Sequence, residues 1–296
     1  MNSPMNRFSI QIADITCAVV SADPTLQFSI ETPIRNFLAK AEDPEITIKA
    51  RMGDLSDFQS GGVMIFDSGS VWRLYRNGKL YTFSFRSEVF GVTPYKIAKI
   101  QKDFAKGDVL IHRPFFGSDT PIYPLDYPLD ELLFINYLSH GKGAEVHACG
   151  LVDAVGNGHL FVGQSGAGKT TTARLWEAEP GVIILSDDRI ILRKIDNTVY
   201  MYGTPWHGEA GFAAPVRTPL MGIYFLQKAA QNELIPLNKI NSTGRLFSCS
   251  FLPFYSPQGL EFVLTFFERV ARTVPCFEFR FVPDRTAVEC LLRTQG

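Results

Sequence analysis

A glycine-rich run that ends in a lysine and a threonine carries the clearest chemistry in this sequence. It reads Gly163-Gln164-Ser165-Gly166-Ala167-Gly168-Lys169-Thr170, between an apolar stretch at 160–162 and a stretch typical of a helix. Its glycines let successive backbone N–H groups face phosphate oxygens, and the helix start adds partial positive charge. Lys169 is placed to reach the β and γ phosphates of a nucleoside triphosphate, and the Thr170 hydroxyl is a ligand for Mg²⁺. The run predicts a site for ATP and Mg²⁺, with Thr171 included among the nucleotide-binding residues.

Two adjacent carboxylates are the second candidate feature. Asp187 and Asp188 follow an apolar stretch at 182–185, and Asp187 lies 18 residues after Lys169. We therefore expect the strand before them to lie next to the strand before the glycine-rich run. In phosphate-loop proteins an aspartate at the end of such a strand holds Mg²⁺. One carboxylate can accept the proton of an attacking hydroxyl while the other holds the metal or its water, which favours phosphoryl transfer.

A segment at 203–219, between two predicted strands, contains several side chains with functional chemistry. Binding residues commonly lie on such loops, so His207 and Glu209 are candidates for contact with a substrate. Arg217 is a candidate for stabilising charge on a transferred phosphoryl group. For each of the three residues, an ordinary surface position is the alternative.

The elements that position these residues follow from hydrophobic periodicity and turn signals. Residues 8–118 mostly show the alternation of strands, with a hairpin turn at Asn77-Gly78. A proline-rich stretch, 114–128, is a predicted connector. We expect helices at 130–140, 170–179, 257–272 and 284–293, and strands at 144–152, 159–162, 182–185, 189–195, 198–202, 222–226 and 276–281.

These elements predict two domains and a mixed sheet. A β-rich domain of unknown role is expected at 1–120, and a catalytic domain with the glycine-rich run at 121–296. Strand–turn–strand, rather than a crossover helix, follows Asp188, so the sheet around the run is predicted to be mixed or antiparallel. The expected fold class is α/β, of the α+β kind.

Composition narrows the class of protein. The 296 residues are 46% hydrophobic and carry a formal net charge of −1, so we expect a packed globular chain with neither nucleic acid nor membrane as a partner. The five cysteines lack metal-like spacing, and the first residues lack the apolar stretch of a signal peptide. Both features predict a cytoplasmic protein with reduced thiols. Whether the chain forms a homo-oligomer is left open.

Three motifs in order resemble the catalytic domain of HPr kinase/phosphorylase. They are His147, sixteen positions before Gly163; the glycine-rich run itself; and Leu-Ser-Asp-Asp-Arg-Ile at 185–190. The resemblance covers roughly 128–228 and implies a phosphoenolpyruvate-carboxykinase-like P-loop fold. It does not extend to the N-terminal half of the chain.

The resemblance also implies a role for each matching residue. Lys169 and the loop amides would hold the triphosphate, and Thr170 and Asp188 would serve the metal. Asp187 would deprotonate the acceptor hydroxyl, and His147 would orient the carboxylate.

One motif of that family is absent. The family's Glu-Ile-Arg-Gly-Leu-Gly stretch supplies a further carboxylate at the magnesium site, and the comparable place here reads Tyr-Met-Tyr-Gly-Thr-Pro-Trp-His-Gly-Glu at 200–209. The part at 203–209 looks like the stretch in HPr-kinase-related proteins, including kinases that phosphorylate serine in peptide precursors.

The leading hypothesis is a kinase that transfers the γ-phosphoryl group of ATP to a Ser or Thr hydroxyl of a protein or peptide. A small-metabolite kinase of the same fold is the first alternative. A non-catalytic nucleotide-binding regulatory or assembly module is the second; the intact acidic pair argues against it. Carboxykinase chemistry is more distant, because no cluster of basic residues is placed to bind a dicarboxylate.

Overall fold

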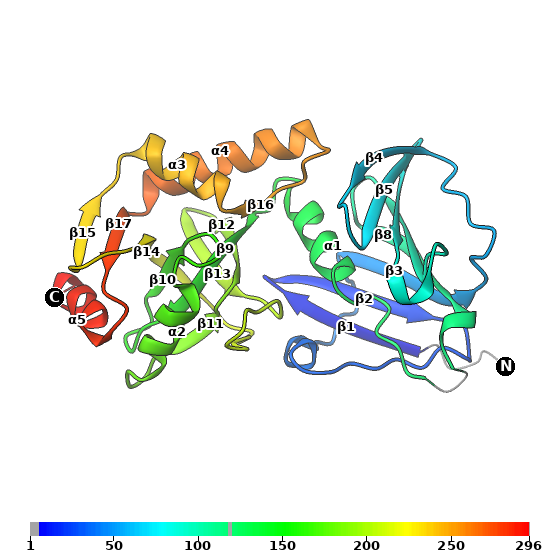
Figure 1. Ribbon diagram of the computed structural model, residues 1–296, viewed down its shortest axis with the longest axis horizontal. Coiled ribbons are helices and arrows are strands. Elements are labelled where there is room, and N and C mark those ends of the chain that lie inside the picture. Colours follow the sequence, from blue (N-terminus) through cyan, green and yellow to red (C-terminus); the bar gives the residue numbers. More distant parts are fainter. Residues whose placement is uncertain (1–5, 118–119, 296) are drawn as a thin grey trace. The chain divides into compact units, whose positions relative to one another are not determined.

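The computed structural model describes residues 6–117 and 120–295 and divides the chain into two compact units, Met1–Tyr137 and Leu138–Gly296 (Figure 1). The sequence placed the domain boundary earlier, at 120/121. Residues after that point contact the N-terminal sheet: the Lys96 ammonium donates to the Asp126 carbonyl at 3.1 Å, and the Tyr95 hydroxyl lies 3.4 Å from the Asp126 carboxylate. These contacts join the end of the proline-rich connector to the first unit.

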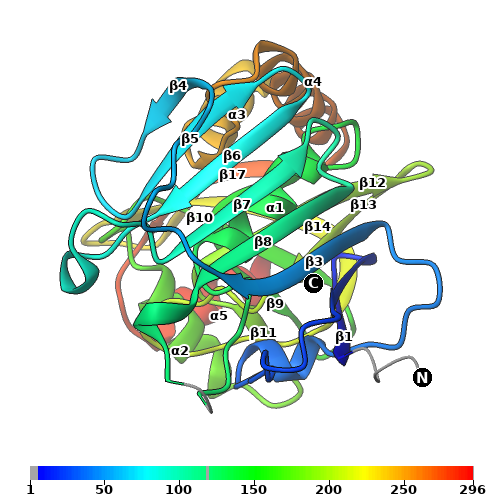
Figure 2. The same cartoon turned by 90° about the vertical axis from the view of Figure 1, so that its right-hand side faces the viewer.

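The first unit is built on an eight-stranded sheet in the order β1-β2-β3-β8-β7-β6-β5-β4. Figure 2 shows strands β3, β8, β7, β6 and β5 side by side in this order. The β2–β3 and β3–β8 pairs are parallel and the others antiparallel. The predicted hairpin at Asn77-Gly78 is confirmed as the β5–β6 turn, where Gly78 has a φ of 56°. The strands are β1 (Asn6–Ile12), β2 (Ile15–Ser21), β3 (Ile46–Gly53), β4 (Val63–Asp67), β5 (Trp72–Asn77), β6 (Leu80–Phe85), β7 (Lys96–Gln101) and β8 (Lys106–His112), followed by helix α1 (Leu129–Leu138).

The second unit is also a mixed sheet, in the order β10-β9-β12-β13-β14-β17-β15, with β11 and β16 paired to β9. The β10–β14 and β14–β17 pairs are parallel and the rest antiparallel, which confirms the predicted mixed sheet. The strands are β9 (Ala144–Val152), β10 (Gly158–Val162), β11 (Ile183–Ser186), β12 (Arg189–Ile195), β13 (Thr198–Gly203), β14 (Arg217–Lys228), β15 (Glu233–Pro236), β16 (Ser250–Phe251) and β17 (Cys276–Phe281).

Helices cover both faces of this second sheet. Apolar residues of α3 (Lys239–Ser248) and α4 (Pro257–Thr273) join one buried cluster with the sheet, and those of α2 (Lys169–Glu177) and α5 (Arg285–Gln295) join another. The sequence predicted α2, α4 and α5 but missed α3, together with the short strands β15 and β16. With two mixed sheets and few helices, the chain is a mixed α/β protein compatible with an α+β fold.

Strand β9 has a position that the sequence did not predict. Its residues 150–152 pair with β10 on one side and with β11 on the other. The expectation that β11 and β10 are neighbours is therefore wrong, because β9 lies between them. The loop after β10 and the acidic pair after β11 are still brought to the same end of the sheet, since both strands run antiparallel to β9.

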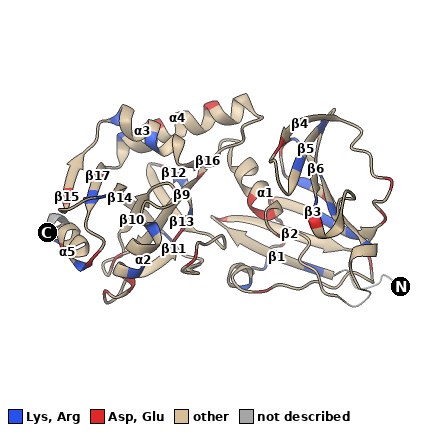
Figure 3. Ribbon diagram, in the orientation of Figure 1, with Lys and Arg blue, Asp and Glu red and all other residues tan. Residues whose placement is uncertain are grey.

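Acidic and basic residues are interspersed along the ribbon of both units (Figure 3). Within the described part of the chain, no helix combines the length and apolar character needed to cross a bilayer.

Candidate active site

The glycine-rich loop joins the end of β10 to the start of α2. Gly166 and Gly168 have φ values of 81° and 109°, in the left-handed region that favours glycine. A Cβ at Gly163 would lie 2.5 Å from the Ala167 Cβ, and one at Gly168 would lie 2.7 Å from the Phe281 ring. The sequence folds into this tight loop because those positions have no side chain.

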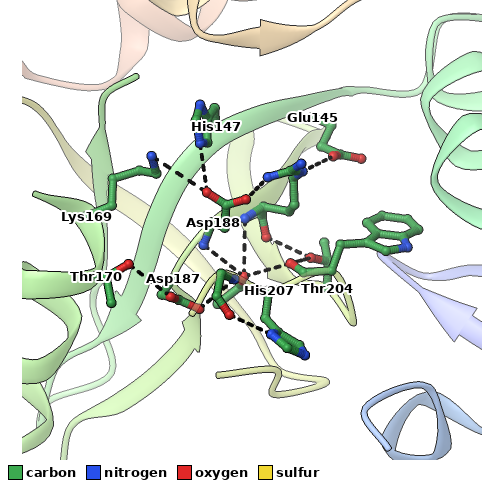
Figure 4. A network of polar contacts seen from close by, with 12 residues as sticks. Glu145, His147, Lys169, Thr170, Asp187, Asp188, Thr204 and His207 are labelled. Atoms are coloured by element: carbon green, nitrogen blue, oxygen red, sulfur yellow. Dashed lines mark hydrogen bonds and ion pairs between the residues drawn. The ribbon is translucent and has the colours of Figure 1, made fainter. Parts of the chain in front are cut away.

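Lys169 points back over the loop (Figure 4). Its ammonium donates to the carbonyls of Gly163 and Gln164 at 3.0 and 3.3 Å, and lies 3.7 Å from the Asp188 carboxylate. The side chain is buried, with 6% exposed. The lysine is therefore held at the mouth of the loop by groups that a phosphate could replace.

Asp187 connects the start of α2 to the turn at 207–210. It is fully buried, and its carboxylate accepts from the Thr170 hydroxyl at 3.2 Å and from the amides of Gly208 and Ala210 at 3.0 and 3.1 Å. The three hydrogen bonds satisfy a carboxylate that has no access to solvent. Asp187 thus fixes the turn against the loop.

Gly208 leaves room for this carboxylate, and replacing it by alanine should destabilise the protein. A Cβ there would lie 2.6 Å from the Asp187 Oδ2 atom, so G208A should cost about 1–3 kcal/mol of unfolding free energy. The control is G244A, in the middle of α3 with nothing within 4 Å of an added Cβ; it should stabilise by roughly 0.5–1 kcal/mol. Urea denaturation measures both variants, and equal stability for the two would contradict the packing described.

Asp188 has different partners from its neighbour. Its Oδ1 atom lies 2.7 Å from His147 Nε2, and its Oδ2 atom forms an ion pair with Arg189. Its side chain is 21% exposed, whereas Asp187 is fully buried. Of the two carboxylates, Asp188 is the one that an incoming hydroxyl could reach.

Strand β9 explains why polar groups gather at this end of the sheet. Cys149 and Leu151 belong to the apolar cluster that includes the α2 residues, and Glu145 and His147 follow on the same face through the alternation of the strand. In the turn between β11 and β12, the Ser186 hydroxyl donates to the Trp206 carbonyl and accepts from the amides of Asp188 and Arg189. This turn aims the acidic pair at the loop.

Burial raises the pKa of both thiols near the site, Cys149 and Cys249, and in the first case the Asp187 charge adds to the effect. This environment suits an apolar packing role, because nucleophilic cysteines need a lowered pKa.

The candidates on the 203–219 segment lie in different places. His207 and Glu209 are exposed and flank the amides that bind Asp187. Arg217 begins β14, where its guanidinium lies 5.2 Å from the centre of the Tyr200 ring and its backbone pairs with Tyr202. Strand β13 therefore lies between Arg217, on β14, and β12, the strand that follows the acidic pair.

Two charged residues of the site were missed from the sequence. Arg189 bonds Asp188 and lies 3.7 Å from the buried carboxylate of Glu145. A signal existed for Arg189, which directly follows the acidic pair. Glu145 stands two residues before His147, on the same face of β9, and gave no comparable signal.

A magnesium site here would rest on few protein ligands. In the described parts of the chain no group of three or more His, Cys, Asp or Glu residues is placed to hold a metal ion. Mg²⁺ at a phosphate loop needs a hydroxyl, one carboxylate, phosphate oxygens and water. The Thr170 hydroxyl and the Asp187 carboxylate, 3.2 Å apart, fit that donor set.

The second unit is thus a mixed α/β fold that brings a glycine-rich loop, a lysine and two carboxylates together. No protein-family model and no curated protein matches the chain. Among solved structures, it is similar to the HPr(Ser) kinase/phosphatase from Coxiella burnetii, with 16% sequence identity, a TM-score of 0.32, and coverage of 51% of this chain and 89% of that chain. The similarity is weak.

We expect Lys169 to make any binding of a nucleoside triphosphate at this loop dependent on pH. Burial, followed by the nearby Arg189 charge, lowers the pKa of Lys169 from 10.5 to about 8. A neutral amine attracts a triphosphate less, so ATP affinity should fall about tenfold as pH rises from about 7 to about 9. Titration calorimetry measures the affinity and the proton taken up on binding. K169R keeps its charge and should show no such fall; a wild-type affinity that is flat over this range would contradict the prediction.

Proposed function

We propose that the second unit binds ATP with Mg²⁺ and transfers the γ-phosphoryl group to a Ser or Thr hydroxyl of a protein or peptide. One observation carries the proposal: each functional side chain of the loop meets its own carboxylate. Thr170 contacts Asp187 at 3.2 Å, and Lys169 contacts Asp188 at 3.7 Å. A module that only binds nucleotide has no need of the second carboxylate.

The contacts favour an exchange of the roles that the family resemblance implied for the two aspartates. Asp187 is fully buried, accepts from two amides and pairs with Thr170, which suits the metal-side carboxylate of a phosphate loop. Asp188 is partly exposed and bonded to His147, which suits a base that must reach its acceptor. We therefore propose Asp188 as the base and Asp187 as the carboxylate on the metal side.

The remaining groups then have distinct tasks. Lys169 and the loop amides would hold the β and γ phosphates, and His147 would orient Asp188 through its ring nitrogen. Bound Mg²⁺ would neutralise charge on the phosphates. When ATP enters, Lys169 would move from Asp188 to the phosphates, which leaves the carboxylate free to accept the proton of the acceptor hydroxyl. The acceptor class is carried over from the resemblance in sequence.

The test is to incubate the purified chain with γ-labelled ATP, Mg²⁺ and a cell lysate, and to identify each labelled species. We expect a protein or peptide labelled on Ser or Thr, with no label when K169M replaces the wild type. Label on a small molecule alone would support the metabolite kinase. Tight ATP binding without any labelled species would support the non-catalytic module.

A further inference from the structure

The guanidinium group of Arg189 lies between two carboxylates, those of Asp188 and Glu145. On one side it forms an ion pair with Asp188, whose other oxygen lies 3.7 Å from the Lys169 ammonium. On its other side the Arg189 Nε atom lies 3.7 Å from the Glu145 carboxylate. The charged groups therefore alternate in sign from a buried anion, through Arg189 and Asp188, to the phosphate-binding lysine.

Arg189 is anchored on the side away from the loop. The Glu145 side chain is completely buried, and the Arg189 side chain is 16% exposed. The guanidinium also lies over the Phe251 ring, 4.2 Å from its centre, an arrangement that restricts the arginine further. Its planar fork is thus held in one orientation before any substrate arrives.

We infer that Arg189 is the positioning residue that keeps the Asp188 carboxylate in place when Lys169 leaves it for the incoming phosphates. This inference rests on the proposed function. His147 and Lys169 both contact Asp188 Oδ1, whereas Arg189 holds Oδ2. After Lys169 has moved, the carboxylate is still held at both oxygens. Without Arg189, Oδ2 is released and the carboxylate can turn after the departing ammonium.

The test replaces the guanidinium without leaving a buried charge alone. R189Q by itself is expected to destabilise the protein, because the buried Glu145 carboxylate would lose a cationic partner. The double variant E145Q/R189Q removes both charges and should fold. We expect kcat for labelled phosphoryl transfer to fall about 10²-fold in both variants, as for a misplaced reactive group, with KM for ATP changed only a few-fold. R189K should recover part of kcat.

Arg193 provides the matched control. It lies on the same strand and the same face, four residues further on, where its Nε atom donates to the Lys142 carbonyl at 3.2 Å. R193Q should leave kcat unchanged. A double variant with wild-type kcat, or an R193Q variant with the same loss, would overturn the positioning role.

A crystal structure of E145Q/R189Q with a bound non-hydrolysable ATP analogue, in which Lys169 contacts the phosphates, separates this inference from the proposed function. Asp188 turned away from His147 supports the positioning role even where no acceptor is labelled. Asp188 still bonded to His147 in the wild-type position overturns it. Absence of transfer to any acceptor in the wild-type protein removes the proposed kinase function instead.

Discussion

Replacing Asp188 by asparagine is expected to abolish phosphoryl transfer while ATP binding persists or tightens. The asparagine amide cannot accept the proton of an attacking hydroxyl, and loss of a general base lowers rates by about 10²–10⁴-fold. Binding should survive because the variant removes a competitor: Asp188 holds the Lys169 ammonium at 3.7 Å in the free protein. Initial rates with γ-labelled ATP and calorimetric titration with ATP measure the two effects separately.

Asp196 is the matched control for this variant. It is an exposed aspartate in the β12–β13 turn of the same unit, with a φ of 53° that asparagine also tolerates. D196N should behave as the wild type in both assays. Full transfer by D188N would remove Asp188 as the base, and loss of ATP binding together with transfer would point to a structural role for its contacts.

Local pattern was sufficient to predict the parts of this site that follow one another closely along the chain. The glycine-rich run, the helix after it and the strands before Asp187 and after Asp188 depend on turn chemistry and periodicity within short windows. The strand β9 with its pairings to both β10 and β11 depends instead on contacts between distant residues. Periodicity predicts that a strand exists, but does not say which strands lie on its two sides.

The different burial of the two aspartates could not be predicted from local sequence pattern for the same reason. The local sequence pattern does not show which of Asp187 and Asp188 is buried. Only the fold buries Asp187 under the turn at 207–210 and leaves Asp188 partly exposed. Glu145 is a second residue whose place in the site depends on contacts between distant strands. Its own strand gives it no functional signal, and it joins the site only because β12 pairs with β9 and brings Arg189 beside it.

Replacing Asp187 by asparagine is expected to remove the response of ATP affinity to Mg²⁺. In the wild type, we expect ATP to bind more tightly when Mg²⁺ is present, because a carboxylate next to the Thr170 hydroxyl attracts the cation. The neutral amide lacks that charge, so the apparent affinity for Mg²⁺ should fall at least tenfold, on the order of 1.4 kcal/mol. Titration of ATP with and without Mg²⁺ measures the effect.

The same change should also loosen the turn. Asp187 accepts from the Thr170 hydroxyl and from the amides of Gly208 and Ala210. An asparagine amide would turn an N–H group toward one of these donors, and the mispaired buried group should cost about 1–3 kcal/mol of unfolding free energy. D188N, whose side chain is partly exposed, should lose less. Urea denaturation of the two variants side by side measures this difference.

Together the two variants decide which aspartate is the base. If Asp188 is the base and Asp187 lies on the metal side, D188N retains the response of ATP affinity to Mg²⁺ and loses transfer. D187N then loses the response to Mg²⁺. The opposite result, with D187N still responding to Mg²⁺ and unable to transfer, would restore the roles implied by the resemblance in sequence. The difference follows from burial, because a base must reach the acceptor hydroxyl to take its proton, and Asp187 is fully buried in the free protein.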